Sequence, residues 1–153
     1  MPTYDLELKA VLENVESIAA NENTIWRVKM GCSNCQEVSP SFIEISSQEE
    51  VDVPGTRGTC NCLYTCKGCK RKIQIDVTPK SLTPCTASDK WSKLVSFEVR
   101  GGKPAEFQPA DGFTVVSEGG AVFEDVDLQD DFAEYDEKAD MAVSIMEMEW
   151  RFE

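Results

Sequence analysis

The sequence contains no histidine among its 153 residues. Ser-His-Asp and Cys-His catalytic sites both need an imidazole as general base, so neither kind of site can be built from this chain. A glycine-rich phosphate-binding loop is also missing. Any metal site must therefore use cysteine, alone or together with carboxylate. From these absences we expect a protein that is not an enzyme.

Long apolar runs are missing too. No segment approaches the roughly 20 consecutive apolar residues that cross a membrane as a helix. Residues 1–9 are charged from the start and lack the basic and apolar regions of a signal peptide. We therefore expect no membrane contact and a cytoplasmic location, with the nucleus as the alternative. Thiols in such a reducing compartment are free or metal-bound rather than paired in disulfides, and the odd number of cysteines, seven, agrees.

Four of these cysteines form two Cys-x-x-Cys pairs, Cys32/Cys35 and Cys66/Cys69. Each pair can supply two thiolates to one ion, and four thiolates complete the closed tetrahedral shell of a structural zinc site. Asn34 and Gly68, inside the pairs, tolerate the tight backbone conformation that such a turn needs. An iron site with the same four thiolates stays open as an alternative. The pattern predicts one structural Zn²⁺ per chain, with no open position for a catalytic water.

The three other cysteines are Cys60, Cys62 and Cys85. Cys62 lies four residues before Cys66, which allows two interpretations. The first is that these residues are ordinary thiols, because free cysteine is commonly a small buried hydrophobic residue. The second is that Cys60 and Cys62 form a soft-metal or redox site, which would make the chain a metal-handling or thiol-redox protein. We favour the first.

Alternation of apolar and charged or polar residues is the main structural signal. Period two is typical of strands that bury one face of an antiparallel sheet. It occurs in residues 4–10, 26–30, 73–77, 95–99 and 146–152. Proline and glycine break the chain into short pieces between these segments. The pattern predicts a mainly β fold, an antiparallel β-sandwich or partly open barrel of short strands with little helix.

Two segments are the best candidates for helix. Residues 6–20 contain good helix formers but also fit a strand, and residues 130–142 could form one or two helical turns. With 41% hydrophobic residues the chain can bury a core. We expect a single zinc-binding β domain over residues 1–153, or two packed halves, a zinc-binding half over about 1–90 and an acidic half over about 91–153.

The net charge of −13 is concentrated in the last third of the chain. Residues 1–103 contain 13 acidic and 13 basic residues, whereas residues 104–153 contain 15 acidic residues against Lys138 and Arg151. Such a surface repels nucleic-acid phosphates and attracts basic partners. We therefore expect no nucleic-acid binding and a protein partner of basic character, with the chain itself a monomer or a weak homo-oligomer.

Short stretches spread along nearly the whole chain make a more specific pattern than the cysteine pairs alone. They are Leu6–Ala10, Lys29–Cys35, Gly55–Gly58, Cys66–Cys69, Phe107–Pro109, Gly112–Phe113 and Tyr135–Ala139. In this order they resemble the eukaryotic CXXC motif-containing zinc-binding proteins, a conserved but uncharacterised family.

The resemblance implies a mainly β protein of about this length, with one zinc held by four cysteines. It places the ligand role on Cys32, Cys35, Cys66 and Cys69, implies no established enzymatic activity, and says nothing about the other three cysteines. We therefore expect a non-enzymatic zinc-binding β protein that serves as a scaffold or a protein-interaction module.

Overall fold

The computed structural model describes residues 2–78 and 80–153, and all regular secondary structure in them is β-strand. The strands are β1 (Thr3–Glu13), β2 (Val15–Ala20), β3 (Ile25–Cys32), β4 (Ile43–Ser46), β5 (Val51–Asp52), β6 (Thr59–Cys60), β7 (Cys62–Thr65), β8 (Lys72–Val77), β9 (Ser92–Arg100), β10 (Gly102–Gln108), β11 (Phe113–Ser117), β12 (Val122–Val126), β13 (Phe132–Asp136) and β14 (Met141–Phe152). Over these described ranges, no helix is long and apolar enough to cross a membrane.

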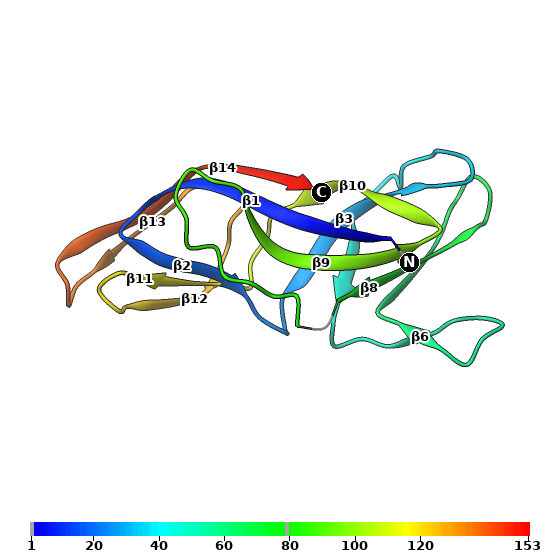
Figure 1. The fold of residues 1–153 in the computed structure, drawn as a ribbon, viewed down its shortest axis with the longest axis horizontal. Helices are drawn as coiled ribbons and strands as arrows, with labels where there is room; N and C mark the ends of the chain where they lie inside the picture. Colours follow the sequence, from blue (N-terminus) through cyan, green and yellow to red (C-terminus); the bar gives the residue numbers. More distant parts are fainter. Residues whose placement is uncertain (1, 79) are drawn as a thin grey trace.

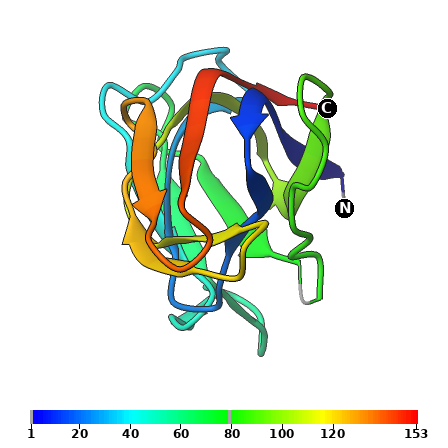
Figure 2. The same ribbon diagram turned by 90° about the vertical axis from the view of Figure 1, so that its left-hand side faces the viewer.

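The strands form curled antiparallel sheets (Figures 1 and 2). The largest has six strands in the order β13-β14-β1-β9-β8-β7. Two three-stranded sheets, β10-β3-β4 and β12-β11-β2, and the small β5-β6 ribbon complete the fold. The predicted mainly β fold of the partly open barrel type is thus confirmed, and the five alternating segments all lie in strands, namely β1, β3, β8, β9 and β14.

Both helical candidates are wrong. Residues 6–20 form β1 and β2, which are separated at Asn14 by a left-handed residue with a φ of 56°. Leu6, Leu8 and Ala10 are buried while the residues between them are less so, and β1 pairs with β14 on one side and β9 on the other. Period-two burial therefore outweighs helix propensity in this segment. Residues 130–142 form β13 and its turn into β14.

Three aromatic rings from three sheets meet in the core. Trp26 of β3 packs edge-on against Phe97 of β9 and Phe113 of β11, with ring centroids 5.8 Å apart in both pairs. Trp26 is 1% exposed. It lies near the start of the strand whose last residue is Cys32, so its packing fixes the course of β3 toward the cysteines.

Candidate metal centre

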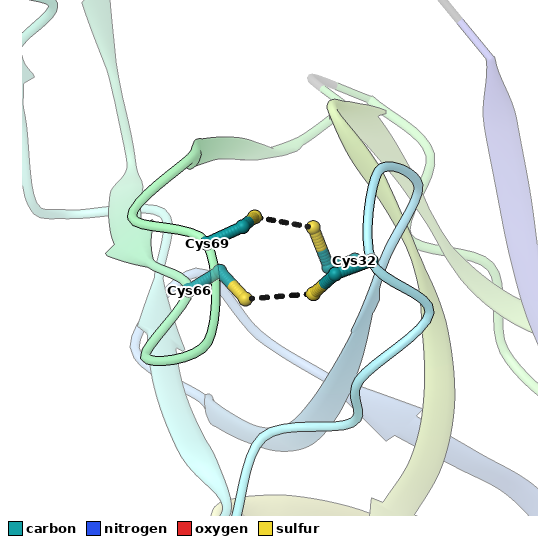
Figure 3. Close-up of side chains that lie close together, drawn as sticks. Cys32, Cys66 and Cys69 are labelled. Atoms are coloured by element: carbon teal, nitrogen blue, oxygen red, sulfur yellow. Dashed lines mark hydrogen bonds between the residues drawn. The ribbon is translucent and has the colours of Figure 1, made fainter.

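Two cysteine-containing turns bring four sulfur atoms together (Figure 3). The first cysteine turn, residues 32–37, follows β3, and the second, residues 66–71, joins β7 to β8. The Sγ atoms of Cys32 and Cys69 are 3.6 Å apart, and those of Cys35 and Cys66 are 3.4 Å apart. All four lie within 4.8 Å of one another. Four sulfurs at about 2.3 Å from one zinc would be about 3.8 Å apart, so the set fits a tetrahedral ion.

The two turns have the same backbone hydrogen bonds. In each turn, the backbone carbonyl of the first cysteine accepts a hydrogen bond from the N–H of the residue four positions later. The N–H of that same cysteine donates to the carbonyl of the residue five positions later. The bonds are Gln36 N to Cys32 O (3.0 Å), Lys70 N to Cys66 O (2.9 Å), Cys32 N to Glu37 O (2.8 Å) and Cys66 N to Arg71 O (2.8 Å). Repetition of one geometry in two separate segments indicates a matched pair of zinc knuckles.

The residue with a left-handed backbone conformation is not at the position in each turn that the sequence predicted. Gln36 and Lys70, directly after the second cysteine of each pair, have φ values of 67° and 64°, whereas Asn34 and Gly68 have no positive φ. Asn34 lies close enough to Cys69 for its side-chain amide to lower the pKa of that thiol. A Cβ on Gly68 would meet the carboxylate of Glu37, which is the end of a flexible side chain and can move aside. Asn34 and Glu37 of the first cysteine turn therefore lie against the second.

The Gly101-Gly102 turn supports the first cysteine turn from behind, a role that sequence analysis missed. Ser33 N donates to Gly101 O over 3.1 Å, and Gly102 pairs with Cys32 in the β10–β3 ladder. A Cβ on Gly102 would lie 2.5 Å from the Gly31 carbonyl oxygen. Only glycine allows β10 to approach this closely. The adjacent glycines were visible in the sequence, but only as a turn signal.

Two of the four thiols, Cys35 and Cys69, have pKa values shifted in opposite directions. The side-chain amide of Asn34 and the N–H of Arg71 donate to Cys69 and lower its pKa to about 6. The N–H of Glu37 acts in the same direction on Cys35, but hydrogen bonding to Cys66 and burial outweigh it and raise the Cys35 pKa to about 12. Sulfurs this close must share protons unless a cation neutralises them. A divalent ion that displaces the protons would let all four act as thiolate ligands.

Cys60, Cys62 and Cys85 lie outside this four-sulfur group. Cys60 is buried, and its Sγ donates to Cys62 O over 3.3 Å. Burial is the main cause that raises the pKa of Cys60, and the charge of Asp76 adds to it. Burial also raises the pKa of Cys62 to about 11 and raises the pKa of Cys85. Neutral thiols are poor nucleophiles, and among the described residues none of these three cysteines lies in a group of three or more close metal-ligating side chains. These surroundings favour the interpretation as ordinary structural thiols over a second metal or redox site.

Comparison with known proteins gives one consistent family. The family model described as "CXXC motif containing zinc binding protein, eukaryotic" matches residues 5–153. The CXXC motif containing zinc binding protein of Bos taurus is 38% identical, over 99% of this chain and 98% of that protein. Its counterpart in Homo sapiens is 37% identical, over 96% and 95%.

Two solved structures have the same fold. The crystal structure of C1orf123 matches with a TM-score of 0.93 and 34% identity, and the match covers 99% of both chains. A hypothetical protein from Plasmodium falciparum matches with a TM-score of 0.90 over the whole of both chains. The latter is 24% identical and supports the fold alone.

Proposed function

The chain belongs to the eukaryotic family of CXXC motif-containing zinc-binding proteins, and on that premise we propose that it is a non-enzymatic scaffold that binds a basic protein partner. Its metal would be one structural Zn²⁺ per chain, held by Cys32, Cys35, Cys66 and Cys69. Four thiolates close the coordination shell, so the ion would have no open position at which to activate water.

Structural zinc is supported chiefly by the distance in sequence between the two turns. Thirty residues separate Cys35 from Cys66, yet their sulfurs are 3.4 Å apart. An ion bound there joins the end of β3 to the β7–β8 hairpin, and its binding free energy contributes to folding. The family description specifies zinc, which favours zinc over iron for this ligand set.

The partner surface is supported by the position of the acidic residues. Nine carboxylates lie between Glu124 and Asp140, and eight of them are exposed: Glu124, Asp125, Asp127, Asp130, Asp131, Glu134, Glu137 and Asp140. In the described part of the chain none of the eight forms an ion pair. Figure 1 places β12 and β13, which carry several of them, at the end of the molecule away from the cysteine turns. We call the eight the acidic surface.

The ninth carboxylate, Asp136, is structural. It is 1% exposed, and it accepts hydrogen bonds from the Ser117 hydroxyl (2.5 Å) and the Ala139 N–H (3.1 Å). These bonds, that from Ser117 foremost, lower the pKa of Asp136. Asp136 therefore stabilises the β13–β14 turn and presents no charge to a partner.

The acidic surface includes a shallow hollow with aromatic walls. Phe123 and Phe132 pack edge-on with centroids 5.6 Å apart. Carboxylates surround the hollow, which has a volume of about 590 Å³: Glu124, Asp125, Asp127, Asp131 and Glu134. Lysine and arginine side chains suit such a site because they can pair with carboxylates while their stems or charged groups contact aromatic rings. This combination favours a basic protein partner over a solely solubilising role.

Neutralising part of the acidic surface should weaken capture of the partner. The change is the triple variant Asp130→Asn, Asp131→Asn and Glu134→Gln, compared with the parent as bait in a quantitative pulldown scored for basic proteins. We expect several-fold less captured partner and a loss of capture as salt rises, because both changes weaken exposed charge pairs. Zinc content and thermal unfolding should stay at parental values, since the three side chains are exposed.

A matched control removes the same charge elsewhere. Glu16→Gln, Asp52→Asn and Asp89→Asn also change one glutamate and two aspartates, all exposed and outside the acidic surface. This variant should capture the partner like the parent. Partners that bind equally to both triple variants, and that resist salt, would refute the acidic-surface proposal and direct attention to the cysteine turns.

A further inference from the structure

Six exposed basic side chains gather at the end of the molecule that carries the cysteine turns. They come from the second cysteine turn, the first residue of β8, the last residue of β9 and the second residue of β10: Lys67, Lys70, Arg71, Lys72, Arg100 and Lys103. The Gly101-Gly102 turn brings these segments together, because a Cβ on Gly101 would lie 2.9 Å from the carbonyl oxygen of Lys72 and 3.9 Å from Nε of Arg71. We call the six the basic surface.

Most of the positive charge on the basic surface is uncompensated. None of the six side chains forms an ion pair within the described part of the chain. Lys70 and Lys72 donate hydrogen bonds to neutral oxygen atoms, which leave their charges in place. Residues 32–37 and 66–72 contain a single carboxylate, that of Glu37. Four thiolates with one Zn²⁺ would add a charge of about −2, which offsets only part of the six positive charges.

The acidic surface has the opposite charge and lies at the opposite end of the molecule. In Figure 1, β12 and β13 are at the left-hand end of the long axis, and the loops that carry the cysteine turns are at the right-hand end. The eight carboxylates, like the six cations, are exposed and form no ion pair among the described residues. Because they are at opposite ends, the two surfaces cannot pair within one chain.

Screening by salt lets each end act separately. The chain has a net charge of −13, so two copies repel each other at low salt. At about 0.1 M salt, however, the Debye length is about 10 Å. Strand β14 alone, with 12 residues, is about 40 Å long. An approaching copy therefore responds to the charges of the end that it meets rather than to the net charge, and ends of opposite charge attract.

We propose that the basic surface binds the acidic surface of a second copy of this chain, so that copies associate end to end. The inference rests on the proposed function, because it names the basic partner of the acidic surface. The two surfaces differ, so a head-to-tail contact leaves one surface free at each end of an assembly, and further copies can add. The average mass therefore rises steadily with protein concentration instead of stopping at the dimer.

Sedimentation of the full-length, zinc-loaded protein over a concentration series tests the proposal. At about 0.1 M salt the weight-average mass should exceed that of one chain and rise with concentration. At about 0.5 M salt it should return to that of one chain, because contacts between exposed charges are screened. If the six cations served only to offset the charge of the metal site, the protein would be a monomer under both conditions.

Two triple variants remove one surface each. Lys72→Gln, Arg100→Gln and Lys103→Gln neutralise half of the basic surface at exposed positions outside the cysteine turns, so zinc content should stay at the parental value. The triple variant of the acidic surface described above neutralises part of the other surface. Each variant alone should associate about tenfold more weakly than the parent. An equimolar mixture of the two should form dimers with parental affinity but no larger assemblies, because one intact pair of surfaces remains.

A matched control makes the same charge change elsewhere. Arg57→Gln, Lys80→Gln and Lys90→Gln are exposed and outside the basic surface, and this variant should associate like the parent. The proposal is overturned if the parent stays monomeric, if the mixture does not restore dimers, or if the control loses as much association as the basic-surface variant. Such a result overturns this inference alone when the acidic-surface variant still captures less of another basic protein. Equal capture by both acidic triple variants refutes the proposed function instead.

Discussion

Replacing Cys66 by serine is expected to abolish stable zinc binding and to lower the free energy of unfolding by several kcal/mol. Cys66 is 3% exposed and begins the second cysteine turn, so its loss removes a ligand and leaves three buried or half-buried thiols without a complete shell. The ion would then no longer join β3 to the β7–β8 hairpin. Denaturant unfolding, with native mass spectrometry for zinc content, measures both effects.

Cys60→Ser is the matched control. Cys60 is as deeply buried as Cys66, at 2% exposed, but lies outside the four-sulfur group. The same chemical change there should leave zinc stoichiometry at the parental value, as should Cys62→Ser. Loss of zinc in either control would mean that the β6–β7 segment supplies a ligand. A Cys66→Ser protein that unfolds like the parent would show that the metal does not contribute to the fold.

Trp26→Ala should destabilise the protein by about 3–5 kcal/mol, the usual effect of removing a large buried aromatic side chain. Trp26 contacts rings on three other strands: Phe97, Phe107 and Phe113, with centroids 5.8 to 6.1 Å away. The cavity cannot close without moving several sheets. Zinc content of the folded fraction should not change, because the cysteine turns are held by their own hydrogen bonds. Chemical denaturation followed by tryptophan fluorescence and circular dichroism measures the loss.

Trp91→Ala is the same substitution at a partly exposed position. The guanidinium of Arg151 stacks over the Trp91 ring at 4.1 Å from its centroid, a contact near the surface. Its removal should destabilise the protein by about 1 kcal/mol. Equal losses for the two tryptophan variants would contradict the assignment of Trp26 to the centre of the core.

The strands that sequence analysis found are those with one apolar and one charged face, such as β1 and β14. Others lack that signal. β10 contains Pro104, and it is tolerated because β10 lies at the edge of its sheet. Asp130 and Asp131, directly before β13, resemble a helix start, and the pairing of β13 with β14 decides the outcome. β10 depends on β3, a partner distant in sequence that local patterns do not reveal.

Prediction of the four-cysteine site from the sequence has the same limit, because local patterns do not reveal contacts with distant segments. The Cys-x-x-Cys spacing is local, so it singled out the four residues whose sulfurs the fold brings together. The support from Gly102 and the contact of Asn34 with Cys69 depend on segments from elsewhere in the chain. Asp136 looked like one more surface charge because its partner, Ser117, is 19 residues away.

X-ray absorption at the zinc edge, with metal counting by native mass spectrometry, tests the central claim most directly. The account predicts one zinc per chain, surrounded by four sulfur atoms at about 2.3 Å. Two tightly bound metals per chain, iron in place of zinc, or an oxygen ligand in the shell would contradict the closed four-cysteine site.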